Sequence, residues 1–146
     1  MDKKGKKIRV HLQTVIEDGE EKESHSLEGK GELYSRGSMT VIKFLENSED
    51  EGEVSHLISI YPKRVNVNRK GQVQINQQFI LNKQTENKIE LPQGNIVMDI
   101  FTQRINHKDI NNNDEGKLRL HYEVLLNGQI KRNHRLTLSY YKEDVE

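Results

Sequence analysis

The chain of 146 residues contains no cysteine and no tryptophan, and only 5% of its residues are aromatic. Without cysteine it can form no disulfide, no thiolate nucleophile and no cysteine-based zinc site. The 23 lysines and arginines balance the 23 aspartates and glutamates, so the sequence lacks the basic footprint of a non-specific nucleic-acid binder. No apolar run is long enough for a membrane span or a signal peptide. These absences predict a soluble cytoplasmic protein with no nucleic-acid and no membrane partner.

Hydrophobic residues are also few, at 32% of the chain. Strands with one face in water need few of them, because only alternate side chains enter the core. A chain of this length is enough for one domain with a single core. We therefore predict one β-barrel domain over residues 1–146, with residues 1–6 and 143–146 as flexible tails.

Residues 117–141 carry the clearest β pattern. Apolar residues stand at every second position from Leu118 to Leu126, and the alternation resumes after Asn127-Gly128 with Ile130, Leu136, Leu138 and Tyr140. This pattern indicates two half-buried strands joined as a hairpin. A two-residue turn would place every apolar residue opposite a polar one, whereas a three-residue loop over residues 126–128 pairs Val124 with Ile130. We therefore predict the three-residue loop, with its glycine in the left-handed conformation.

The same argument predicts two further hairpins. Asp18-Gly19 fits a two-residue type I′ turn that pairs Leu12 with His25. Residues 69–71 fit a three-residue loop with Gly71 in the left-handed conformation.

Gly29 and Gly31 both fall on the inward face of one strand, which suggests a sharp bend or room for a large neighbour. If Arg36-Gly37 is the next turn, Ile42 and Phe44 lie opposite these glycines.

Further along the chain, Pro92 and Gly94 mark another turn. Residues 107–116, with Asn111 to Asn113 in a row, form the longest predicted loop. No amphipathic helix of ten or more residues is present. About ten strands joined by tight turns predict an all-β fold, a single closed antiparallel up-and-down β-barrel of eight to ten strands, because closure removes the exposed sheet edges.

The order and spacing of several residues also resemble a known family. These residues are Arg69, Gly71, Phe79, Pro92, Gly94, Thr102, Gly116, Tyr122, Gly128 and Asn133. Over nearly the whole chain the pattern is similar to the YwiB-like family of uncharacterised bacterial proteins, and it departs at Leu91 and Gln93, where the family favours threonine and an aromatic residue. The resemblance implies a calycin-like, lipocalin-like β-barrel in the bacterial cytoplasm. It implies no activity, since none is assigned to the family.

Polar residues on predicted inward faces are the candidate site. They are Thr14, His25, Gln77, Thr102, Arg104, Tyr122, Arg132 and His134. Some could be solvated beyond the end of the barrel. Alternatively they satisfy one another at the barrel mouth, or line a pocket for an anionic or carboxylate ligand. The predicted ligand-binding residues are Arg132, Tyr122, His134, Arg104, Gln77 and Thr102.

The histidines argue against a metal site. His121 falls on the polar face of its strand and His134 on the apolar face of the next, and His11 and His25 likewise face opposite ways. With no convergent ligands, we predict no metal and no cofactor. No recognisable motif pairs a serine or threonine nucleophile with a base, so an enzyme of unknown reaction is kept only as a residual hypothesis.

The densest basic patch after the N-terminus comprises Lys63, Arg64, Arg69 and Lys70. Only Tyr61 lies nearby to stack on a base, whereas single-stranded nucleic acid is bound by basic grooves interleaved with aromatic residues. We interpret the patch as a solvated charged face.

Two functions from different classes remain open. The first is binding of a small apolar or amphipathic ligand inside the barrel, and the second is a protein-interaction or regulatory module. An interior cavity of about 300 Å³ or more favours the ligand. An interior filled by side chains favours the module, and the expected filling residues are Phe44, Phe79, Met98 and Leu120.

Overall fold

The computed structural model describes residues 5–50, 52–110, 114–128 and 130–143, and every structural statement below concerns these residues. They form ten strands: β1 (Lys6–Asp18), β2 (Glu21–Arg36), β3 (Met39–Ser48), β4 (Gly52–Tyr61), β5 (Arg64–Lys70), β6 (Gln74–Ile80), β7 (Gln84–Leu91), β8 (Gly94–Lys108), β9 (Glu115–Leu126) and β10 (Ile130–Lys142). Within them no helix is long and apolar enough to cross a membrane.

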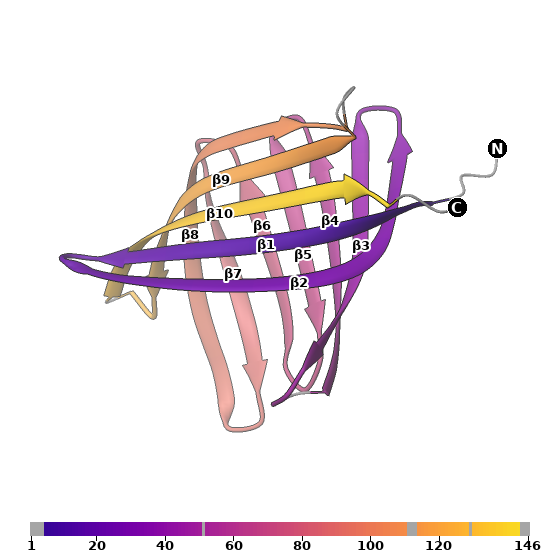
Figure 1. Cartoon of the computed structure of the whole chain (residues 1–146). Coiled ribbons are helices and arrows are strands. Elements are labelled where there is room, and N and C mark those ends of the chain that lie inside the picture. Colours follow the sequence, from indigo (N-terminus) through magenta and orange to yellow (C-terminus); the bar gives the residue numbers. More distant parts are fainter. Residues whose placement is uncertain (1–4, 51, 111–113, 129, 144–146) are drawn as a thin grey trace.

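The strands close into one antiparallel barrel. Each strand pairs with its neighbours in the chain, and β1 pairs with β10 from Ile8↔Lys142 to Glu17↔Asn133, which completes the ring. The predicted closed up-and-down β-barrel is thereby confirmed. Figure 1 shows that β1, β9 and β10 cross steeply over the strands from β3 to β7, and that the β1–β2 hairpin extends beyond the rest of the barrel.

The barrel interior is filled by its own side chains. Alternate residues of the strands point inward and form one continuous hydrophobic cluster, as period-two patterning requires. The four residues expected to fill the interior are all buried: Phe44, Phe79, Met98 and Leu120 are exposed by 2%, 0%, 6% and 0%.

The β9–β10 hairpin has the predicted odd loop, displaced by one residue. Leu118 pairs with Leu138, and β10 resumes opposite Leu126, so the loop covers residues 127–129, of which 129 lies outside the described residues. Asn127 and Gly128 both have positive φ, at 48° and 72°. Period-two patterning cannot detect this difference, because a register shift of two residues leaves every side chain on the same face.

Two other hairpins show the same kind of displacement. The β1–β2 turn has two residues, as predicted, but Asp18 pairs with Glu21, so Leu12 lies opposite Leu27 and not His25. The predicted type I′ turn is wrong, since that turn needs positive φ at both central residues and only Gly19 has it.

The β5–β6 loop has three residues, as predicted, but it covers residues 71–73, because Lys70 still pairs with Gln74. Gly71 is not among the described glycines with positive φ, so its predicted left-handed conformation is wrong.

The inward glycines of β2 make room for a large neighbour, as expected. A Cβ added to Gly31 would lie 2.7 Å from Cβ of Phe44, and one added to Gly29 would lie 3.0 Å from the Phe44 ring. Phe44 lies opposite Gly31, whereas Ile42 lies opposite Leu33. The Phe44 ring therefore covers the backbone of β2 where a side chain would otherwise stand.

The predicted Pro92-Gly94 turn is present, with Leu91 paired to Gly94. The predicted 107–116 loop is shorter, because β8 continues to Lys108 and β9 begins at Glu115. Asn111 to Asn113 lie outside the described residues. Of the predicted tails, Lys6 already belongs to β1, Glu143 N donates to Lys7 O at 2.9 Å, and residues 1–4 and 144–146 lie outside the described residues.

Candidate functional site

Three of the predicted site residues form one row across the barrel interior. Thr102 on β8 pairs with Tyr122 on β9, and Tyr122 pairs with His134 on β10. The Tyr122 ring centroid lies 5.0 Å from that of His134 and 4.7 Å from that of Phe79. Tyr122 is exposed by only 4%, so it serves as a core aromatic residue between two other rings.

Burial controls the titration of this row. It raises the pKa of Tyr122, and it lowers the pKa of His134 to about 4, with the charge of Arg132 acting in the same direction. His134 is therefore neutral at pH 7. Near the row, Thr102 Oγ1 is buried without a hydrogen-bond partner.

The remaining polar residues predicted to face inward are dispersed. Gln77 Nε2 contacts Met98 Sδ at 3.9 Å in the interior. Arg132 lies 3.5 Å from Asp18 Oδ2, and the small hollow beside them measures about 90 Å³. His25 has an inward register position but is exposed, since the β1–β2 hairpin extends beyond the barrel (Figure 1). For His25, the alternative of a solvated residue past the barrel end is therefore the right one.

Arg104 does not point into the barrel, contrary to the prediction. A bulge between Thr102 and Arg104 shifts the β8 register, so that Arg104 pairs with His121 and is exposed on the outer face. A bulge inserts one residue and reverses the parity of everything after it. Alternation alone therefore places this arginine on the wrong side.

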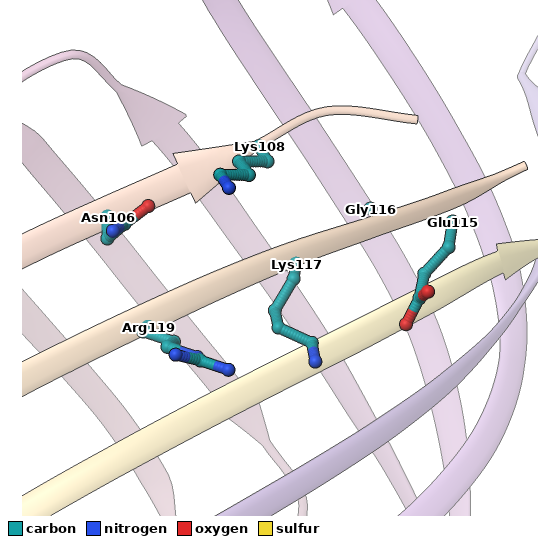
Figure 2. A pocket seen from close by; sticks show the side chains of 6 residues that line it. All are labelled: Asn106, Lys108, Glu115, Gly116, Lys117 and Arg119. Atoms are coloured by element: carbon teal, nitrogen blue, oxygen red, sulfur yellow. The ribbon is translucent and has the colours of Figure 1, made fainter. Parts of the chain in front are cut away.

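Because of this bulge, cationic side chains of β8 and β9 lie together on the outer face of the barrel. Lys108 pairs with Lys117, and Asn106 pairs with Arg119. Figure 2 shows these four side chains with Glu115 around one cleft, whose volume is about 240 Å³. Within the described residues, Lys108, Lys117 and Arg119 form no ion pair.

The cleft borders a well-packed part of the barrel. Gly116 lines the cleft, and a Cβ added to it would lie 2.2 Å from the Tyr140 ring. The Tyr140 hydroxyl donates to Asp109 Oδ1 at 3.0 Å and lies 2.8 Å from His107 Nε2. These contacts fix the end of β8 and the start of β9, the two segments that carry the cations.

A family model for a domain of unknown function (DUF1934) matches residues 10–138 of the chain. The chain belongs to this family. The uncharacterized beta-barrel protein YwiB of Bacillus subtilis (strain 168) is 24% identical over 133 residues, which cover 91% of this chain and 92% of that protein. The crystal structure of the ywiB protein from Bacillus subtilis superposes with a TM-score of 0.82 and 22% identity, over 97% of this chain and 96% of that one. The predicted resemblance is confirmed, and the structural likeness shows that the DUF1934 chain and the ywiB protein share a fold.

Other polar features of this DUF1934 chain do not single out a ligand. A hollow of about 620 Å³ over β4 to β7 is lined mainly by amide side chains and by charges of both signs. Arg64 of the predicted basic patch stacks over the Tyr61 ring at 4.2 Å. Among the described residues, no three His, Cys, Asp or Glu side chains are arranged to hold a metal ion.

The cationic cleft was missed from the DUF1934 sequence because its residues come from two strands. Lys108 and Lys117 stand nine positions apart, and only the pairing of β8 with β9 places them opposite each other. The available signal was that Lys117 and Arg119 share the outward face of one strand. Finding their partners required the position of the bulge.

Proposed function

We propose that this protein is a binding module that recognises an anionic, phosphate-bearing ligand in the cleft on the outer face of β8 and β9. The observation that carries the proposal is the cross-strand pair Lys108 and Lys117 beside Arg119. Like charges directly opposite on a sheet destabilise it. An anion between them removes the repulsion and receives charge-assisted hydrogen bonds.

The ligand class follows from the shape and charge of the cleft. A volume of about 240 Å³ lies below the roughly 300–1,000 Å³ of drug-sized ligand pockets, so the cleft suits one or two phosphate groups. Asn106 adds an uncharged donor, and Glu115 adds the one carboxylate among the lining side chains. The filled interior favours the protein-interaction or regulatory module over a ligand held inside the barrel, the other hypothesis drawn from the sequence.

The test is calorimetric titration with sodium pyrophosphate at low ionic strength. Lys108→Ala and Lys117→Ala should each weaken binding about tenfold, because each removes a hydrogen bond to a charged group. Lys88→Ala is the matched control, since Lys88 is exposed on β7 and lies away from the cleft. No measurable binding by the wild-type chain, or an equal loss in Lys88→Ala, would contradict the proposal.

A second candidate function is a small ligand held at the barrel mouth. It is supported by Thr102 Oγ1, which is buried without a hydrogen-bond partner, and by Arg132, whose ion pair with Asp18 borders a small hollow. A native mass spectrum tests it, since an adduct lost on denaturation and absent from Arg132→Ala is expected. For either function we also propose a cytoplasmic setting, with which the absence of cysteine agrees.

A further inference from the structure

We propose that the outer wall of β8, β9 and β10 is a docking surface for single-stranded nucleic acid, whose backbone phosphates occupy the cationic cleft. This inference rests on the proposed function, since it names the source of the phosphate. It also goes further, because it assigns roles to residues outside the cleft.

The cations continue along the wall beyond the cleft. One row further along, Arg104 pairs with His121, and His121 pairs with Arg135. Arg104 is exposed and has no ion pair within the described residues, while Arg135 lies 3.2 Å from Glu17 Oε1. Partial burial lowers the pKa of His121, and the positive charges of Arg104, Arg135 and Arg119 act in the same direction.

Two exposed aromatic residues flank these cations. Among the described residues, the exposed large hydrophobic side chains are Leu45, Phe101 and Tyr141. Phe101 pairs with Glu123 at one end of the β9 segment, and Tyr141 pairs with Glu115 at the other. Both aromatics therefore lie on the same wall as the cations, one past each end of the row.

This arrangement has the two elements that single strands require, a basic track for the backbone and aromatic platforms for the bases. From Glu115 to Glu123 the wall measures about 27 Å along β9 at the antiparallel rise per residue. That length suits a site of about four nucleotides, the lower end of single-strand site sizes on β-barrel folds. An acidic peptide would use the cations but would give the exposed rings no base to stack on.

The sequence argued against nucleic acid from net charge and from the apolar setting of most aromatic residues. Neither argument applies to this wall. The charges balance over the whole chain, whereas the cleft is lined by three cationic side chains and one carboxylate. Phe101 and Tyr141 are the aromatic side chains that point outward with the largest exposure, at 37% and 42%.

The test is fluorescence anisotropy with a fluorescein-labelled twelve-residue oligothymidylate, with sodium pyrophosphate and a twelve-residue polyglutamate peptide as competitors. Phe101→Ala and Tyr141→Ala should each weaken oligothymidylate binding at least about fivefold, and binding should fall steeply with added salt. Tyr141→Phe should retain binding, because the ring is kept. Leu45→Ala is the matched control, since Leu45 is also an exposed large hydrophobic side chain but lies on β3.

The outcomes separate this inference from the proposed function. If pyrophosphate binds but the oligothymidylate binds no more tightly, the inference is overturned and the small-anion site stands. If polyglutamate competes as well as unlabelled oligothymidylate and both aromatic variants bind normally, the wall is a general acidic-partner surface and the inference is again overturned. If neither pyrophosphate nor the oligothymidylate binds, both proposals fail.

Discussion

Gly31 shows how a single missing side chain shapes this barrel. An added Cβ would lie 1.8 Å from Lys43 O and 2.7 Å from Phe44 Cβ, so backbone and core would both have to move. We predict that Gly31→Ala lowers the free energy of unfolding by about 3 kcal/mol or more, in the range reserved for severe steric defects. Chemical denaturation measures this. Lys30→Ala, at the neighbouring exposed position, should stay within about 0.5 kcal/mol of wild type, and equal effects of the two changes would refute the steric account.

His134 makes the stability of the fold depend on pH, and the direction of this dependence follows from its pKa. Its pKa in the folded chain is about 4, mainly because of burial, against about 6.5 when unfolded. The unfolded chain therefore binds more protons between these values, and stability falls as the pH drops through this window.

We predict that the melting temperature of wild type falls by about 3 °C more than that of His134→Gln between pH 7 and pH 5. This corresponds to about 1 kcal/mol in this size range after allowing for solvent screening. A His134→Gln protein with the wild-type slope would show that another group is responsible.

At the residue scale, the sequence gives the chemistry of the site residues better than their location. The inward positions of Thr102, Tyr122 and His134 follow from alternation. The outward position of Arg104 does not follow from alternation, because the bulge before it cannot be seen in the hydrophobic pattern.

At the scale of elements, the junction of β6 and β7 departs most from a regular ladder. These strands pair only at Gln74↔Glu90 and Ile75↔Ile89. Beyond these two pairs, hydrogen bonds from side chains of β7 replace the backbone hydrogen bonds between the strands. Asn87 Oδ1 accepts from Gln78 N at 2.8 Å, and Thr85 Oγ1 donates to Gln78 O at 2.5 Å. Both side chains are buried, so the barrel stays closed through side-chain hydrogen bonds.

Asn87→Ala should therefore open this junction. It leaves the part-buried Gln78 N–H without its acceptor, which costs about 1 kcal/mol. Hydrogen exchange at the Gln78 amide should accelerate, and the denaturation midpoint should fall. Glu86→Ala, at the adjacent exposed position, is the control. Unchanged exchange at Gln78 in Asn87→Ala would mean that the ladder does not depend on this side chain.

Hairpin registers show the limit of sequence reasoning at this scale. Matching the apolar faces of paired strands predicts whether a loop has an even or an odd number of residues. This prediction holds for the β1–β2, β5–β6 and β9–β10 loops. The loops themselves are displaced, because a register shift by an even number of residues, two for β1–β2 and β9–β10 and four for β5–β6, leaves every side chain on the same face. Local backbone preferences, such as the positive φ of Asn127, decide among the registers that remain.

At the scale of the whole molecule, ten meandering strands with ends that pair give a closed barrel, and alternation alone leads to that fold. Whether such a barrel is hollow depends on side-chain volumes in three dimensions. Here the interior is packed with Phe44, Phe79, Met98 and Leu120. The candidate cleft lies outside, on consecutive strands whose facing side chains depend on the bulge in β8. The hydrophobic pattern does not show that bulge, which is why the sequence did not reveal the cleft.

The central claim is that this filled barrel binds anions on its outer wall. Amide chemical shifts of ¹⁵N-labelled protein titrated with sodium pyrophosphate test it most directly. The account predicts shifts concentrated at residues 104–108 and 115–121, on β8 and β9. Shifts concentrated instead at Ile16, Arg132 and His134, around the barrel mouth, would contradict it.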